Sequence, residues 1–264
     1  MIQLQEVSMT FPGGITALHP LSIIFGRGEF TVLLGSSGAG KSTLLRCLNF
    51  LNQPSGGRIT IAGIGELRHG NVLRQHRCRA GMIFQHHHLI ARQSALQNVL
   101  LGRLGYHSTW RSLFPLSRSE RYIALEALDR VGLLHKAMER VDSLSGGEQQ
   151  RVGIARVLAQ KPQIILADEP VASLDPASAH NVLSLLRDIC KEGNISAIIS
   201  LHQVDLARHY SDRIVGMRAG KVVLDGKPEQ FSERDLAELY SQSISSDPQK
   251  SITPEKQAIL SFNL

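Results

Sequence analysis

FTVLLGSSGAGKS, residues 30–42, is the stretch of sequence that decides the core of the fold. Its first five residues, Phe30–Leu34, are continuously apolar and predict a short buried strand that ends at a glycine. Residues 35–42 match the pattern G-x-x-x-x-G-K-[ST] at every fixed position, and residues 41–51 have the pattern of a helix. A strand, a glycine-rich turn and a helix in this order predict a loop that binds phosphate groups.

The chemistry of this loop favours a nucleoside triphosphate with Mg²⁺. Glycines let successive N–H groups point inward, and the start of the helix adds partial positive charge. Lys41 is predicted to reach the β- and γ-phosphates, and the Ser42 hydroxyl to be a ligand of Mg²⁺. The alternative, a glycine-rich turn with a surface lysine, does not account for the full motif in its setting. The candidate nucleotide-binding residues here are Gly35, Ser36, Ser37, Gly38, Ala39, Gly40, Lys41, Ser42 and Thr43.

Two acids follow a second apolar strand. Residues 163–167 predict a buried strand, and Asp168 and Glu169 come directly after it. Since the carboxyl ends of parallel strands form the ligand-binding edge of an open α/β sheet, both acids are expected beside the phosphates. Asp168 is predicted to hold Mg²⁺ through its water shell, and Glu169 to polarise the attacking water. The alternative is that both acids cap the turn at Pro170.

A histidine ends the next apolar strand, which is predicted over residues 196–201. His202 could donate a hydrogen bond to the γ-phosphate and help to hold the attacking water. A single histidine at the end of a strand is more often structural. Its position one strand after the acid pair instead favours a catalytic role, so Glu169 and His202 are the candidate catalytic residues.

Strands that alternate with helices predict an α/β fold with a mostly parallel sheet. The first residues alternate as in a strand, with Leu4 and Glu6 on one face and Val7 on the other; with residues 21–25 they predict an antiparallel layer. Further strands are expected at 58–62, 80–84, 214–217 and 221–224, and helices at 147–160 and 177–191.

A helical insertion interrupts this alternation. Residues from about 89 to 145 are rich in Leu, Arg and Glu, show helical periodicity at 124–134, and contain no convincing strand. We therefore predict one domain over residues 1–240 with a helical subdomain at about 89–145. Residues 241–264 are polar, include two prolines, and predict a loosely packed tail.

Composition narrows the possible partners. The 264 residues suffice for one large core and a subdomain, and the formal net charge is +6. A basic balance fits bound phosphates, an anionic membrane surface or a nucleic acid, but no Lys/Arg-rich run supports specific nucleic-acid binding. No apolar run approaches the roughly 20 residues that a membrane-spanning helix needs. Any membrane function is therefore expected to go through a partner.

LSGGEQQR, residues 144–151, resembles the LSGGQ signature of ABC ATPases, with Glu148 where that signature has glutamine. Physically it is a second anion site, made by Ser145 and the N–H groups of Gly146 and Gly147 at the start of a helix. The resemblance implies a P-loop NTPase core and a head-to-tail homodimer, in which each signature closes over ATP bound to the other copy. The alternative is an ordinary N-capped helix.

Other motifs of the family follow in order. The resemblance implies that Gln85 contacts Mg²⁺ and nucleotide and links them to the helical subdomain and the membrane partner. Residues 173–175 resemble the loop that passes between the two subunits. Phe11 stands where the family commonly stacks an aromatic ring on adenine; alternatively it is a core residue.

Within the family the chain most resembles the ATP-binding subunits of phosphonate importers, through residues 94–105, 110–114 and 167–176. The resemblance implies an ATP hydrolase on the cytoplasmic face of the inner (plasma) membrane. Its expected partners are permease subunits and, indirectly, a solute-binding protein, with no specific nucleic acid. Two alternatives stay open: an importer ATPase for a phosphate-like anion, amino acid or metal chelate, and a non-transport ABC ATPase that acts on nucleic acid.

Overall fold

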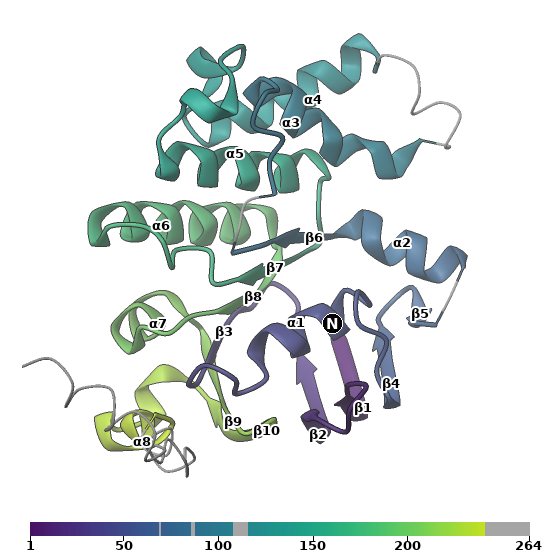
Figure 1. Ribbon diagram of the computed structural model, residues 1–264, viewed down its shortest axis with the longest axis vertical. Coiled ribbons are helices and arrows are strands. Elements are labelled where there is room, and N and C mark those ends of the chain that lie inside the picture. The colour runs from purple at the N-terminus through teal and green to yellow at the C-terminus, as the bar shows by residue number, and fades with distance from the viewer. Residues whose placement is uncertain (69, 86–87, 108–115, 241–264) are drawn as a thin grey trace, which may run out of the picture.

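A computed structural model of the chain describes residues 1–68, 70–85, 88–107 and 116–240. All strands formed by these residues belong to one of two sheets (Figure 1). The strands are β1 (Ile2–Thr10), β2 (Thr16–Phe25), β3 (Phe30–Leu34), β4 (Gly56–Ile61), β5 (Gly65–Glu66), β6 (Ala80–Ile83), β7 (Ile164–Asp168), β8 (Ser196–Ser200), β9 (Arg213–Arg218) and β10 (Lys221–Gly226).

The helices cover both faces of the larger sheet. The α-helices are α1 (Lys41–Leu48), α2 (Asn71–Arg79), α3 (Ala95–Leu100), α4 (Arg118–Arg130), α5 (Gly146–Ala159), α6 (Pro176–Gly193), α7 (Val204–Tyr210) and α8 (Glu233–Glu238). The 3₁₀ helices are η1 (Leu101–Tyr106), η3 (Leu134–Lys136), η4 (Val141–Ser143) and η5 (Pro228–Gln230). The sequence patterns did not predict α2, α7 and α8, which are only 9, 7 and 6 residues long.

The larger sheet confirms the predicted parallel core. Its strand order is β10-β9-β3-β8-β7-β6, and only β10 runs antiparallel to its neighbour. The strand β3 is buried along its whole length, and alternate residues enter different cores. Val32 faces the core beneath the helical region, whereas Leu33 faces the core shared with α1 and the smaller sheet. Burial on both faces explains why these strands read as continuous apolar runs.

The predicted N-terminal layer is a four-stranded antiparallel sheet in the order β2-β1-β4-β5. The predicted alternation along β1 is wrong after Leu4. A register shift between Leu4 and Val7 accompanies a left-handed backbone at Glu6, where φ is 49°. This irregularity moves Val7 to the buried face with Leu4 and leaves Glu6 exposed. An apolar residue thus stays in the core although the period of two is interrupted.

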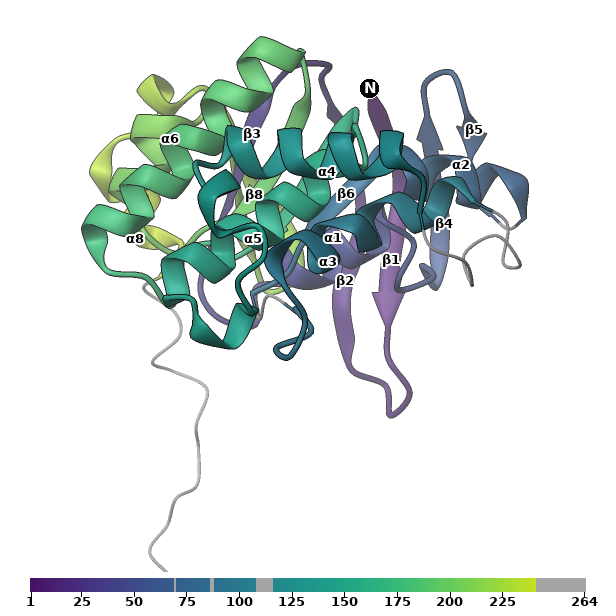
Figure 2. The same cartoon turned by 90° about the horizontal axis from the view of Figure 1, so that it is seen from above.

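The predicted helical insertion contains α3, η1 and α4, which pack with α5 on one side of the larger sheet (Figures 1 and 2). Its two described strand-like residues form a single isolated bridge, Ser94 to Arg140. The exact limits of the subdomain stay a prediction. Residues 110–114 and the predicted tail at 241–264 lie outside the described residues.

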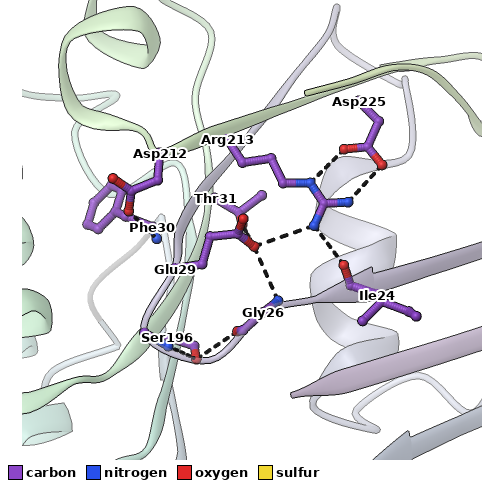
Figure 3. A network of polar contacts seen from close by, with 10 residues as sticks. Ile24, Gly26, Glu29, Phe30, Thr31, Ser196, Asp212, Arg213 and Asp225 are labelled. Carbon is purple, nitrogen blue, oxygen red and sulfur yellow. Dashed lines mark hydrogen bonds and ion pairs between the residues drawn. The ribbon is translucent and has the colours of Figure 1, made fainter. Parts of the chain in front are cut away.

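A network of polar contacts joins the two sheets where the parallel strands begin (Figure 3). Arg213 donates to both carboxylate oxygens of Asp225, at 2.6 and 2.7 Å, and to the carbonyl of Ile24 at 2.7 Å. Glu29 lies 3.4 Å from the same guanidinium group and accepts from the N–H of Gly26 at 3.2 Å. Since β2 belongs to the antiparallel layer and β9 to the parallel sheet, this network fixes one layer to the other.

Candidate nucleotide-binding site

The predicted phosphate loop lies between β3 and α1, at the carboxyl end of the parallel sheet. All three of its glycines, Gly35, Gly38 and Gly40, have backbone angles that residues with a side chain rarely adopt. A Cβ atom at Gly35, where φ is 149°, would lie 2.2 Å from the carbonyl oxygen of Met217. Gly38, where φ is 78°, faces open space instead. The loop therefore needs glycine for its backbone at all three positions, and it leaves open space for a ligand at Gly38.

The lysine of the loop points back over it. The Lys41 side chain is buried, and its Nζ donates to the carbonyls of Gly35 at 2.7 Å and Ser36 at 3.1 Å. Burial lowers the pKa of Lys41, while the carboxylates of Glu169 and Asp168 act in the opposite direction.

The start of α1 is open to an anion, because Gly40 at its N-cap supplies no side-chain hydrogen bond to the first N–H groups. A buried cation, a glycine turn and an uncapped helix start together fit a phosphate chain.

The predicted metal ligands Ser42 and Asp168 lie together. The Ser42 hydroxyl donates to Asp168 Oδ1 at 2.7 Å, and the buried hydroxyl of Ser200 donates to the same oxygen at 3.0 Å. Arg46 lies 4.0 Å from the other oxygen of this carboxylate. A hydroxyl and a carboxylate are hard oxygen donors of the kind that Mg²⁺ prefers when water and phosphate complete its shell. Their role as metal ligands stays a prediction.

The candidate catalytic pair is also in contact. Glu169 Oε1 and His202 Nε2 are 2.5 Å apart, and the N–H of Glu169 donates to Ser200 Oγ at 2.9 Å. Glu169 has φ 49°, a left-handed conformation that costs a non-glycine residue roughly 1–3 kcal/mol. Both side chains line a small cavity of about 40 Å³, which is room enough for a water molecule.

Phe11 and Gln85 are not in contact with this cluster in any described interaction. Phe11 is half-buried in the turn between β1 and β2 and packs against the core of the antiparallel layer. Gln85 is exposed just after β6 and precedes residues 86–87, which the structure does not describe. Stacking of Phe11 on adenine and contact of Gln85 with Mg²⁺ therefore stay predictions.

The signature-like segment forms a different site. Ser145 caps α5, and a cavity of about 300 Å³ is lined by residues 145–148 together with residues 173–175 and the first turns of α6. Its described lining contains no residue of the phosphate loop. One copy of the chain thus presents two separate half-sites, each with free N–H groups or polar side chains at the start of a helix.

Sequence patterns missed three residues around these half-sites. Ser200 touches both acids through its hydroxyl, and the strand register that pairs it with Asp168 is the signal that could have found it. Tyr240 donates to the carbonyl of His202 at 3.0 Å. Lys136 pairs with Glu148 of the signature at 2.7 Å. The last two contacts join separate elements, 38 residues apart for Tyr240 and 12 residues apart for Lys136, and no local sequence pattern predicts them.

The fold and this cluster define a nucleotide-binding ATPase cassette. The family described as ABC transporter matches residues 18–172, more than half of the chain, and the chain belongs to this family. It is therefore an ATP-binding, ATP-hydrolysing component of the ABC class.

Individual proteins with known names show which members of the family the chain resembles. The chain is 64% identical over 240 residues to the phosphonates import ATP-binding protein PhnC 3 of Nostoc sp., with 91% of this chain and 92% of the relative covered. It is 59% identical over 248 residues to the phosphite import ATP-binding protein PxtA of Stutzerimonas stutzeri, with 94% and 90% covered. The chain is also similar to a solved ATP-binding cassette, MJ0796, which is a dimer in a post-hydrolysis state bound to ADP and Pi. The sequence identity is 33% and the TM-score is 0.76, with 88% of this chain and 100% of that chain covered.

Proposed function

We propose that this chain is the ATP-hydrolysing subunit of an importer for phosphonates. One observation supports the ATPase chemistry: Lys41, Asp168 and Glu169 lie close together at one edge of the parallel sheet. The cargo rests on relatives at 46–64% identity, most of them named as phosphonate importers.

Each side chain has a distinct part in the proposed reaction. Mg²⁺ bound with ATP would neutralise phosphate charge, and Ser42 and Asp168 would hold it. Lys41 would leave its carbonyl partners and bind the β- and γ-phosphates. Glu169 would accept a proton from the attacking water, while His202 holds the Glu169 carboxylate and donates toward the γ-phosphate.

Two copies would complete each reaction site. The phosphate loop and the signature cavity of one copy are separate, so a head-to-tail homodimer would let the signature of each copy close over ATP held by the other. The dimeric cassette with ADP and Pi supports this arrangement. ATP binding energy would then drive closure through contacts that exist only in the closed state.

The proposed work is done on a permease at the cytoplasmic face of the membrane. In the described part of the chain, no helix has the length and apolar character to cross a bilayer. The surface over residues 85–105 would contact the permease subunits, and a solute-binding protein would act only through them. No specific nucleic-acid partner is part of this proposal.

Complementation tests the composite site. One copy carries Lys41→Ala and the other carries Ser145→Arg with Gly147→Asp; each alone is expected to be inactive. A mixed dimer has one intact site, because the loop of the second copy meets the signature of the first. We expect ATPase activity to return on mixing, measured as phosphate release. If mixing two correctly folded variants restores no activity, the composite site is wrong.

Phosphite is a second candidate cargo, since a relative at 59% identity is named as a phosphite importer. A phosphonate carries a P–C bond where phosphite carries P–H, so a receptor can distinguish them by size. ATPase stimulation of the assembled transporter by methylphosphonate, phosphite and phosphate, each with its binding protein, separates the candidates. Strongest stimulation by methylphosphonate is expected; preference for phosphite would reassign the cargo and leave the ATPase role intact.

A further inference from the structure

The signature-like segment carries a negative charge that the LSGGQ pattern lacks. Glu148 is the third residue of α5, and its carboxylate folds back over the start of the helix. One oxygen, Oε2, accepts from the N–H of Ser145 at 2.9 Å and from its hydroxyl at 3.0 Å. Ser145 Oγ in turn accepts from the N–H of Glu148 at 3.4 Å. The carboxylate therefore lies beside the hydroxyl that the proposed function assigns to the partner's nucleotide.

This position is good for the helix but poor for an anion site. A carboxylate near the N-terminus of a helix stabilises the helix, because it faces the positive end of the helix dipole. The same negative charge repels a triphosphate that approaches those N–H groups. A glutamine can form the same capping contacts without the charge. An extra feature is therefore needed if this signature is to bind ATP of a second copy.

Lys136 provides that feature. Its Nζ lies 2.7 Å from Glu148 Oε1, the oxygen that Ser145 does not use. The ion pair joins η3, which ends at Lys136, to the start of α5 across 12 residues of sequence. Hydrogen bonds from Lys136 and Ser145 lower the pKa of Glu148 to about 2, so the acid is charged at neutral pH. Glu139 and Arg151 also act on the pKa of Lys136, with opposite signs.

We propose that Lys136 is a positioning residue that neutralises Glu148 and so allows this Glu-containing signature to accept the triphosphate bound by a second copy of the chain. The inference rests on the proposed composite site. It also assigns Glu148 a defined orientation, with one oxygen on Lys136 and the other on Ser145. The Ser145 hydroxyl then keeps a fixed position toward the cavity that residues 145–148 and 173–175 line.

A simpler role for Lys136 is to brace η3 against α5. The two roles differ in what happens when the acid is also replaced. If Lys136 only braces, Lys136→Met and the Lys136→Met/Glu148→Gln double variant are equally defective, because both lack the ion pair. If Lys136 neutralises charge, the glutamine restores function because no charge is left to neutralise.

The experiment measures ATP-dependent dimerisation of full-length variants by analytical ultracentrifugation, in a Glu169→Gln background that slows hydrolysis. Lys136→Met is expected to need roughly fivefold to tenfold more ATP for half-maximal dimer, the effect of one uncompensated nearby charge. The double variant is expected to return to within about twofold of the parent. Lys191→Met, which removes an exposed lysine at the far end of α6, is the matched control. Thermal unfolding confirms that each variant is folded.

Each outcome decides the question. A Lys136→Met variant that dimerises like the Lys191→Met control overturns the inference, and so does a defect that Glu148→Gln leaves unrepaired. The defect should also shrink at 0.5 M salt relative to 0.1 M salt, because salt screens exposed charges. Ser145→Arg is measured beside them. If Ser145→Arg dimerises normally, the composite site itself is wrong, whereas a failure confined to Lys136 leaves the composite site standing.

Discussion

The two ends of the parallel sheet are built in opposite ways. At the amino ends of the strands, Arg213 satisfies Asp225, Glu29 and a carbonyl of β2 in one closed network. At the carboxyl ends, Glu169 keeps a left-handed backbone and its carboxylate faces His202 beside a small cavity. One end joins two layers of the fold, and the other keeps charged groups and strain beside an open site.

The difference between the two ends shows where this fold tolerates a strained residue. Strained residues persist only where the surroundings hold them in place. Ser200 does so for Glu169 by accepting its N–H, and the same hydroxyl donates to Asp168. A substitution at the amino end should therefore change mainly the free energy of unfolding. A substitution at the carboxyl end should change mainly ATP hydrolysis, and it should change stability only where it relieves the strain at Glu169.

The largest expected effect is on the chemistry of the carboxyl end. Glu169→Gln is expected to lower ATPase turnover by about 10²–10⁴, because the amide cannot accept a proton from water. This corresponds to roughly 3–5 kcal/mol of barrier. Steady-state phosphate release measures it, and the unfolding midpoint should stay close to that of the parent. Near-equal turnover would remove Glu169 from the role of base.

A substitution at the amino end is expected to have a smaller effect, and the quantity that changes is the free energy of unfolding. Arg213→Leu leaves Glu29 and Asp225 without their cation and should lower the free energy of unfolding by about 2–3 kcal/mol. Urea unfolding measures the change, and ATPase turnover per folded molecule should be preserved. Arg218→Leu, at the other end of β9, is the matched control, with an expected change within about 0.5 kcal/mol. Equal losses of unfolding free energy in both variants would contradict the role of the Arg213 network in joining the two sheets.

The smallest effect tests the strain itself. Glu169→Gly removes the side chain that disfavours φ 49° and should raise the free energy of unfolding by about 1 kcal/mol, although activity is lost. Glu169→Gln is the control, because it keeps the Cβ atom and so keeps the strain. Urea unfolding of both variants measures the difference. A glycine variant no more stable than the glutamine variant would show that the backbone at this position stores no strain.

Contiguous motifs were the parts of the site that the sequence could predict. The strand over Phe30–Leu34 and the phosphate loop after it lie where their pattern places them. The acid pair and His202 could be assigned to one sheet edge because buried parallel strands have a recognisable apolar run and a defined carboxyl end. Short helices such as α2 and α7 could not be predicted from the sequence. Their packing against β6 and β3, and not their own apolar periodicity, stabilises them.

By itself, the sequence determined the phosphate loop, the parallel core around it and the signature-like helix start, because each is encoded in neighbouring residues. Only the tertiary structure decided that Ser200 supports both acids, that Val7 rejoins the core past an irregular Glu6, and that Lys136 meets Glu148. The physical reason is that these contacts join residues from separate elements. Their geometry depends on strand register and helix packing, which no short segment specifies alone.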